Sequence, residues 1–513
     1  MKNHLYLIIL FIFFSCNKNN DDGVSVCDDT ITLETLEATN VNYQSVTLNG
    51  VINKPNCDGF SITSQGFVYG TSPSPTINDI IAEVTGQNNI TSGVENLTSS
   101  TTYYCRTFLT SPTKTLYGNE VSFTTTVPQL TYVPDDVFEQ KLIDLDYDDL
   151  LDDYVITENI NFITELDLEP VSGQSTIVTD LTGIQDFVAL EVLNCRQNDI
   201  KTLDLTNNTN LKIIDCSFNS INYLNVGNNN NLEELYCNRN QISSLEVNQC
   251  PTLEILDCSH NLLPSLNISS NLGLKELNCG DNFLSTLEVS KNLELEKLYC
   301  YFNTIESLNI SNNPNLTNLN CWRNQISELN VTNNKALISL NCSENQIKNL
   351  DVSQNYLLES LSCYENSLLT LDVSKNPLLK SIDAKINQLT EVNLGETNDL
   401  VFLSICCNNL NSIDISNSLS LRDIYIFGNQ ITTLDFSNHK NIFALWCGVN
   451  QLSSLNVANG NNLGISELVI SGNPNLLCVQ VDPVIPAHGF NCDPPPPGYW
   501  CKDPWTEVNT ICD

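Results

Sequence analysis

Apolar residues recur along most of this chain with a period of 21 residues. In one clear unit, Leu211, Ile214 and Cys216 are separated by polar residues and followed by Asn219. Alternation of apolar and polar positions predicts a short strand with one buried face. Twelve steps of 21 residues separate Cys195 from Cys447 without an insertion or deletion. The pattern therefore predicts a stack of similar coils whose apolar side chains point inward.

One position of the unit is cysteine in most coils: Cys195, Cys216, Cys237, Cys258, Cys279, Cys300, Cys321, Cys342, Cys363 and Cys447. Ala384, Ile405, Ile426 and Ile470 take the same position elsewhere, so we interpret these cysteines as small buried hydrophobic residues. A ladder of disulfides or metal sites is the alternative. Parallel side chains on adjacent strands make the disulfide torsion unfavourable, so we expect free thiols.

Asparagine marks the turns in two columns. The first contains Asn198, Asn219, Asn240, Asn261, Asn282, Asn303, Asn324, Asn345, Asn366, Asn387, Asn408, Asn429, Asn450 and Asn473. The second follows ten residues later, at Asn208, Asn229, Asn271, Asn292, Asn313, Asn334, Asn355 and Asn376. An inward amide can bond backbone groups that a bend leaves unpaired. Each unit thus has two similar halves, which predicts two extended faces and little helix.

The consensus LxxLxCxxNxIxxLxVxxNxx resembles the nested 21-residue class of bacterial leucine-rich repeats over residues 160–477. The resemblance implies a mostly β solenoid that serves as a binding scaffold rather than as an enzyme.

The segment before the array is expected to cap its exposed core. Residues 133–154 predict an amphipathic helix with Phe138, Leu142 and Ile143 on one face, within a helical cap of residues 133–159. This segment resembles the cap of exported bacterial repeat proteins, and residues 181–190 resemble an irregular first repeat. Nearby acids approach calcium-loop spacing, but solvated side chains are the favoured interpretation. These acids are Asp144, Asp146, Asp148 and Asp149.

Four further cysteines lie in the Pro-rich tail, residues 478–513, which we predict to cap the other end. In an exported chain they suggest two disulfides, whose connectivity the spacing does not define. The pairs we expect are Cys478 with Cys512 and Cys492 with Cys501.

The first residues predict export. A lysine precedes the apolar run of residues 5–14, which suits a signal peptide over residues 1–15 and is too short to span a bilayer. Ser15 and Cys16 resemble a lipoprotein cleavage site, and the acidic tether of residues 16–27 resembles that of Bacteroidota surface lipoproteins. The resemblance implies acylation of Cys16, location at the outer membrane and cell surface, and the lipid as the only anchor. An ordinary signal peptide is the alternative.

Residues 28–127 alternate in the manner of strands and resemble a fibronectin type III module, which implies a β-sandwich spacer. Leu97 and Tyr103 match that family's tyrosine corner, and Cys105 takes a core position beside it. Cys27 and Cys57 have no evident partner.

Charge and histidine content limit the possible functions. The net charge of −38 disfavours nucleic acid as a partner, because an acidic surface repels phosphates. Beyond the signal segment only His260, His439 and His488 remain, and they assemble no catalytic triad or zinc motif. We therefore predict no enzyme activity, no catalytic or metal-binding residue and no cofactor.

Outward positions beside the cysteine column vary from coil to coil and carry large side chains. The predicted ligand-binding residues are Tyr236, Arg239, Tyr299, Tyr301, Phe302, Trp322, Arg323, Tyr364, Tyr425, Phe427 and Trp446. They gather mainly in the coils of Cys300 and Cys321, and again near Ile426 and Cys447. Trp, Tyr and Arg dominate protein interfaces, and aromatic rings also suit sugars. Capture of a protein or surface glycan is the main hypothesis. A structural envelope role and an accessory subunit of a polymer-degrading system are the alternatives.

The opposite half of each unit carries a uniform polar stripe between its two inward apolar positions. It comprises Asp204, Asn225, Glu246, Asn267, Glu288, Asn309, Asn330, Asp351, Asp372, Asn393, Asp414, Asp435 and Asn456. A solvated edge is the favoured interpretation, and weak divalent-cation binding is the alternative.

Overall fold

The structure is a computed structural model that describes residues 31–54, 61–86, 88–171, 176–485 and 500–512. It divides into two compact units, residues 1–129 and 130–513. The predicted signal peptide, Cys16, the tether and Cys27, Cys57 and Cys492 lie outside the described residues.

The first unit consists of two antiparallel sheets. One has the order β1-β2-β5, and the other has the order β4-β3-β6-β7 with β8 also pairing with β6. The strands are β1 (Thr32–Thr39), β2 (Val46–Asn53), β3 (Ser64–Gly70), β4 (Ile80–Glu83), β5 (Asn89–Val94), β6 (Thr102–Thr110), β7 (Thr115–Tyr117) and β8 (Val121–Thr124). Alternate residues of both sheets, among them Leu48, Phe67 and Cys105, form one core. The Tyr103 hydroxyl accepts a 3.0 Å bond from the Thr98 N–H, as a tyrosine corner requires. Membership of the fibronectin family stays a prediction.

The second unit opens with a small cap. Strand β9 (Leu130–Tyr132) pairs antiparallel with β10 (Tyr154–Ile156), and helices α1 (Asp136–Asp144) and α2 (Thr157–Ile160) lie beside them in sequence. The Asp135 carboxylate accepts bonds from the first N–H groups of α1 and so begins the helix. Phe138 and Leu142 are fully buried, whereas Ile143 is only partly covered.

The prediction of one helix through residue 154 was wrong. Asp146 and Asp153 take left-handed backbone conformations, with φ of 60° and 68°, so the chain leaves the helix and turns back as β10. The buried Glu139 carboxylate accepts bonds from the N–H groups of Asp152 and Tyr154 and holds this turn in place.

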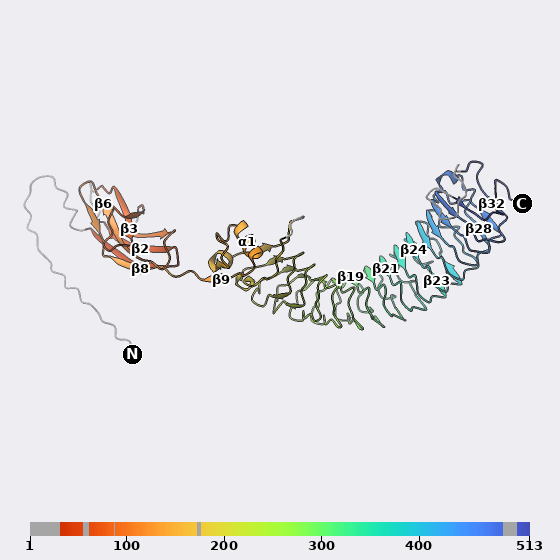
Figure 1. The fold of residues 1–513 in the computed structure, drawn as a ribbon, viewed down its shortest axis with the longest axis horizontal. Helices are drawn as coiled ribbons and strands as arrows, with labels where there is room; N and C mark the ends of the chain where they lie inside the picture. Colours follow the sequence, from red (N-terminus) through yellow and green to blue (C-terminus); the bar gives the residue numbers. More distant parts are fainter. Residues whose placement is uncertain (1–30, 55–60, 87, 172–175, 486–499, 513) are drawn as a thin grey trace, which may run out of the picture. The chain divides into compact units, whose positions relative to one another are not determined.

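Sixteen parallel strands form one face of the array (Figure 1). They are β11 (Glu165–Asp167), β12 (Val192–Asn194), β14 (Ile213–Asp215), β16 (Glu234–Tyr236), β17 (Ile255–Asp257), β18 (Glu276–Asn278), β19 (Lys297–Tyr299), β20 (Asn318–Asn320), β21 (Ser339–Asn341), β22 (Ser360–Ser362), β24 (Ser381–Asp383), β26 (Phe402–Ser404), β27 (Asp423–Tyr425), β29 (Ala444–Trp446), β31 (Glu467–Val469) and β33 (Trp500–Cys501). From β12 to β29 each residue pairs with the one 21 positions later, as Val192 does with Ile213. Two additional residues separate Ala444 from its partner Glu467, and the short 3-10 helix Asn462–Gly464 lies in that interval.

The opposite face is less regular than the sequence predicts. Within the described residues, the strands of this face are β13 (Thr202–Asp204) with β15 (Tyr223–Asn225), β23 (Thr370–Asp372) with β25 (Glu391–Asn393), and β28 (Thr433–Asp435), β30 (Ser454–Asn456), β32 (Cys478–Gln480) and β34 (Glu507–Asn509). The coils between β15 and β23 have none. Within this unit, the labelled strands β19, β21 and β24 follow the inner side of the curve and β23 the outer side (Figure 1). We call these the inner and outer faces.

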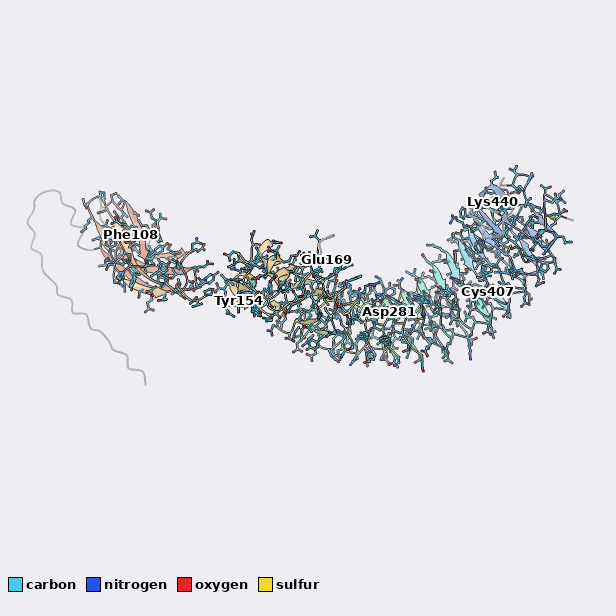
Figure 2. The ribbon with its side chains drawn as sticks, viewed as in Figure 1. Phe108, Tyr154, Glu169, Asp281, Cys407 and Lys440 are labelled. Carbon is cyan, nitrogen blue, oxygen red and sulfur yellow. A yellow bond between two sulfur atoms is a disulfide. The ribbon has the colours of Figure 1, made fainter. Side chains whose placement is uncertain are left out.

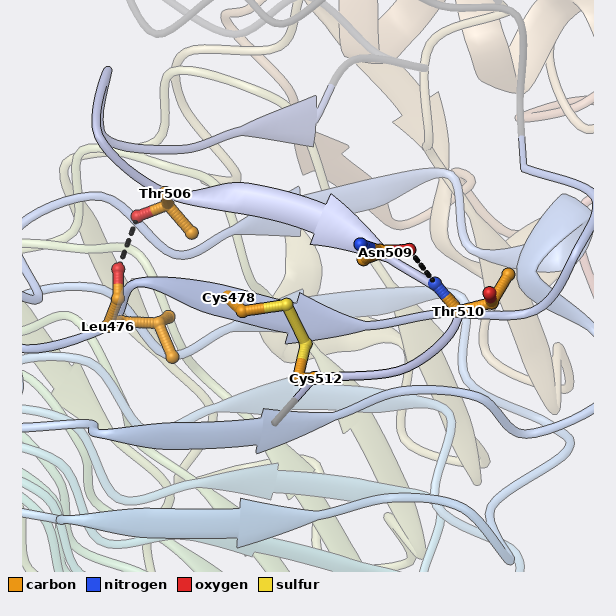
Figure 3. The surroundings of a disulfide bond; sticks show 6 residues. All are labelled: Leu476, Cys478, Thr506, Asn509, Thr510 and Cys512. Carbon is orange, nitrogen blue, oxygen red and sulfur yellow. Dashed lines mark hydrogen bonds between the residues drawn. A yellow bond between two sulfur atoms is a disulfide. The ribbon is translucent and has the colours of Figure 1, made fainter.

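The core is a continuous column of leucine, isoleucine, valine and cysteine from the cap to the last coil. At the far end the tail extends both faces instead of forming a separate cap, because β33 pairs with β31 and β34 with β32. Cys478 on β32 forms a disulfide with Cys512, which is the expected pair (Figure 3). Beside it, the Thr506 hydroxyl donates a 2.8 Å bond to the Leu476 carbonyl. Cys501 is also disulfide-bonded, and its expected partner Cys492 lies outside the described residues.

Candidate functional site: the inner face of the array

Each coil presents its variable side chains on the inner face through a change of backbone conformation. In the Cys300 coil, Tyr299 ends the strand, Tyr301 follows the buried Cys300, and Phe302 then takes a positive φ of 52°. Successive side chains alternate in a strand, but a left-handed residue breaks this alternation. Phe302 therefore contacts its inner-face neighbour Trp322 instead of pointing into the core. The same position is left-handed in Phe218, Arg239, His260, Asp281, Arg323, Glu344, Glu365, Ile386, Cys407 and Val449.

Five side chains from four coils form one connected group, which we call the central cluster: Phe302, Trp322, Arg323, Glu344 and Tyr364. The Phe302 and Trp322 rings meet edge to face with centroids 4.7 Å apart, and the Arg323 guanidinium lies 4.1 Å from the Phe302 centroid. Glu344 Oε1 accepts bonds from Trp322 Nε1 at 3.0 Å and from the Tyr364 hydroxyl at 3.3 Å. One carboxylate therefore fixes two aromatic side chains that sequence places 42 residues apart.

Tyr301 and Tyr299 border the central cluster. The Tyr301 ring lies over Gly280, where a Cβ would come within 2.4 Å of the ring, so glycine makes this placement possible. Burial, followed by the charge of Asp257, raises the pKa of Tyr301. His260 contacts the Tyr301 ring, and its Nδ1 lies 2.6 Å from Asp281 Oδ2. Burial, followed by the charge of Glu276, raises the pKa of Tyr299. The polar groups beside these two tyrosines are thus already engaged with their own neighbours.

A second aromatic group lies further along the inner face, and we call it the distal cluster: Phe402, Tyr425, Phe427 and Trp446. The Tyr425 centroid lies 5.8 Å from that of Phe402 and 5.7 Å from that of Trp446, which also approaches Phe427 at 6.2 Å. Trp446 Nε1 donates a 3.0 Å bond to Glu467. As in the central cluster, a carboxylate holds the indole.

The structure separates the remaining two predicted residues from both clusters. Arg239 and Arg196 lie on either side of the Phe218 ring, at 5.1 Å and 5.0 Å from its centroid. The Tyr236 hydroxyl donates a 2.8 Å bond to Glu234, and burial followed by that bond raises the pKa of Tyr236. Tyr236 and Arg239 thus lie apart from the central and distal clusters, which occupy the two regions where the sequence gathers the outward residues.

Sequence reasoning missed five residues that these groups contain or contact: Arg196, Phe218, Phe402, Glu344 and Glu467. Each of the two carboxylates lies one coil beyond a tryptophan whose indole N–H it accepts. The two pairs occupy different positions of the unit, so the 21-residue period gives no common signal for them. All of the predicted aromatic residues are half-buried, since neighbouring coils cover part of each ring.

The polar stripe of the outer face has a structural role. At eleven of its thirteen positions the side-chain oxygen accepts the backbone N–H two residues later, as Asp351 does from Ser353 at 2.9 Å and Asn309 from Ser311 at 3.1 Å. Hydrogen bonds from the Ser353 hydroxyl and backbone lower the pKa of Asp351. A residue that caps a turn in this way explains why only Asp, Asn or Glu occupies the stripe.

The cysteine column is buried and contains free thiols in the described structure. Burial raises the pKa of Cys321, Cys363 and Cys447 to about 12, so these thiols stay protonated and unreactive. Over the described ranges, no three histidine, cysteine or acidic side chains converge as metal ligands. No helix in those ranges has the length and apolarity to cross a membrane.

Comparison with solved protein structures identifies the fold of the array. No family model and no curated protein matches the chain. The functional domain of InlJ from Listeria monocytogenes, described as including a cysteine ladder, is similar at 28% identity with a TM-score of 0.57. The match covers 69% of this chain and 77% of that one. The fold is a leucine-rich-repeat solenoid. The mostly β architecture predicted from the 21-residue period is thereby confirmed.

Other solved leucine-rich-repeat proteins resemble the array less closely. The leucine-rich-repeat domain of APL1B is 22% identical with a TM-score of 0.43, and the match covers 52% of this chain and 84% of that one. The leucine-rich effector YopM from Yersinia pestis is 18% identical with a TM-score of 0.41, covering 67% of this chain and 88% of that one.

Proposed function

We propose that this leucine-rich-repeat protein is a binding scaffold that captures a protein ligand on its inner face, with the central cluster as the main contact. The observation that carries the proposal is the fixed arrangement of Trp322 and Tyr364 on Glu344. Ordering flexible side chains costs free energy on binding, so aromatic groups already held by hydrogen bonds bind more tightly than mobile ones. Tryptophan, tyrosine and arginine are also the residues that contribute most at protein interfaces.

The experiment that tests this function compares two full-length variants in cells. One replaces Tyr301, Trp322 and Arg323 with alanine, and the matched control replaces Tyr223, which is exposed on the outer face. After chemical cross-linking and mass spectrometry, we expect one stoichiometric protein partner with the wild type and the control. The inner-face variant should lose it while keeping the wild-type far-UV circular dichroism spectrum. Equal capture by all three proteins would reject the site.

A surface glycan is the other ligand that half-exposed aromatic rings suit. The same three proteins on a glycan array separate the two ligands: glycan binding lost only in the inner-face variant would replace the protein ligand in this proposal.

Display on the outer membrane through acylated Cys16 is part of the proposal and rests on the sequence of residues 1–27. Replacing Cys16 with alanine should release the protein from the membrane fraction. Retention of Cys16→Ala in washed membranes would contradict the lipid anchor and leave the inner-face experiment unaffected.

A further inference from the structure

Two adjacent cysteines, Cys406 and Cys407, lie outside the buried cysteine column. Ile405 takes the inward position of this coil, so Cys406 and Cys407 follow it on the inner face. Cys407, located within the array in Figure 2, is the only exposed free cysteine among the described residues. The regular role of cysteine in this protein, which is to fill the core, does not explain this pair.

The backbone brings the two thiols to the same side of the chain. Cys407 has a φ of 58°, and this left-handed conformation breaks the alternation that would otherwise direct adjacent side chains to opposite faces. The Cys406 thiol accordingly contacts both the Cys407 thiol and the Ser404 hydroxyl, with the Asp383 carboxylate nearby. Burial, followed by the charge of Cys407, raises the pKa of Cys406 to about 12.

Cys407 is open on the side of the next coil, whereas Cys406 beside it is buried. Gly428 occupies the position that follows Cys407 by 21 residues, and a Cβ built there would lie 3.5 Å from the Cys407 sulfur. Since glycine has no side chain, nothing extends from this position across the thiol. The pair lies between Tyr364 of the central cluster and Tyr425 of the distal cluster in the coil order.

We propose that Cys406 and Cys407 form a dithiol site that binds a thiophilic metal or metalloid ion through both sulfur atoms. Sulfur ligands select soft ions, and two neighbouring thiols chelate one ion more tightly than a single thiol does. With an arsenic(III) oxide of the form R–As=O, both S–H bonds break and two As–S bonds form. The two protons leave with the oxygen atom as water, so the reaction requires no oxidant or reductant.

The test uses phenylarsine oxide and intact-mass measurement of the folded full-length chain. We expect one adduct per chain that survives an excess of a monothiol and is removed by a dithiol. Cys406→Ser and Cys407→Ser should each lose this adduct, because either change leaves one sulfur. Serine already occupies inner-face positions such as Ser343 and Ser471, so both variants should fold, which circular dichroism checks.

The matched control is Cys342→Ala, which removes a buried column thiol where another coil has Ala384. This variant should keep the adduct. Any reaction at the other cysteines is the same in all the proteins compared, because every variant retains those cysteines. A second probe, Cd²⁺, should give a sulfur-to-metal absorption band that both serine variants lose. An unaltered monothiol-resistant adduct in either serine variant, or none in the wild type, would overturn the proposal.

Discussion

The inner and outer faces of the array come from nearly identical half-units, yet they differ in backbone pairing. On the inner face, Asn324 Nδ2 donates to the carbonyls of Cys300 and Cys321, and its Oδ1 accepts the Ile305 N–H at 3.0 Å. On the outer face, Asn313 Nδ2 donates to Val289 and Asn292, but within the described structure its buried Oδ1 has no partner. Outer strands are missing in the middle coils, where an opening of about 550 Å³ lies beside Leu308 and Leu329.

The difference teaches that curvature decides which half-unit becomes a continuous sheet. Strand pairing on the inner face requires a spacing of roughly 4.8 Å between coils. A curved stack that keeps this spacing on one side must exceed it on the other, so the outer backbone groups separate. The two asparagine columns reflect this difference. The column of the inner face is uniform, whereas four other residues interrupt the column of the outer face: Cys250, Thr397, Ser418 and His439.

The largest effect should come from removing asparagine on the inner face. Asn324→Ala leaves a buried N–H and several carbonyls unpaired, so we expect a loss of about 3 kcal/mol in the free energy of unfolding. Asn313→Ala, the outer-face counterpart, should cost about 1 kcal/mol because its oxygen already lacks a partner. Urea denaturation followed by far-UV circular dichroism measures both. Equal losses would remove the energetic distinction between the faces.

The stability of the array should depend on pH through His439, which replaces asparagine in the outer-face column. Its Nε2 lies 3.1 Å from the Ile415 carbonyl, in the place of the asparagine amide, and burial lowers the pKa of this histidine. A lowered pKa means that the unfolded chain binds the proton more readily. Stability should therefore fall as the pH drops below the unfolded value of about 6.5.

The matched variant is His439→Asn, which restores the residue of the column and removes the titrating group. Melting temperatures of wild type and variant, measured from pH 8 to pH 5, should diverge progressively toward the acid end. Parallel curves would show that protonation of His439 does not contribute.

The smallest effect is expected for the ion pairs between coils along the edge of the inner face. Lys275 Nζ lies 2.7 Å from Glu254 Oε2, but both side chains are about half exposed, at 47% and 48%. Solvent screening limits such pairs, so Lys275→Met should leave the midpoint of urea denaturation at its wild-type value. A clear fall of that midpoint in the variant would mean that the edge stabilises the inner sheet substantially.

The residues that point inward could be predicted from sequence because packing repeats their chemistry every 21 positions. Leu298 and Cys300 meet the same neighbours as Leu319 and Cys321, so the core and the fold class followed directly. The length of the cap helix did not follow, since the left-handed turn at Asp146 and the buried Glu139 depend on contacts that no period encodes.

The sequence gathers the outward residues in the coils of Cys300 and Cys321 and again near Ile426 and Cys447, and the ring contacts of the central and distal clusters lie in these coils. Their positions follow from the register, whereas their contacts depend on how far each side chain reaches across coils. Glu344 shows the difference, because its role comes from Trp322 and Tyr364 on either side of it. Sequence reasoning selected aromatic and basic side chains at the outward positions and therefore overlooked the carboxylate that joins them.

The constant 21-residue register also gives the array a modular length. Because Val192 lies beside Ile213 and every later inner strand up to β29 repeats this offset, removing 21 residues from the middle would join two compatible coils. Removing 20 would bring outward residues into inward positions along the next strand. Whole coils can therefore be lost, gained or exchanged without change to the core. The side chains on the inner face can thus be replaced one coil at a time.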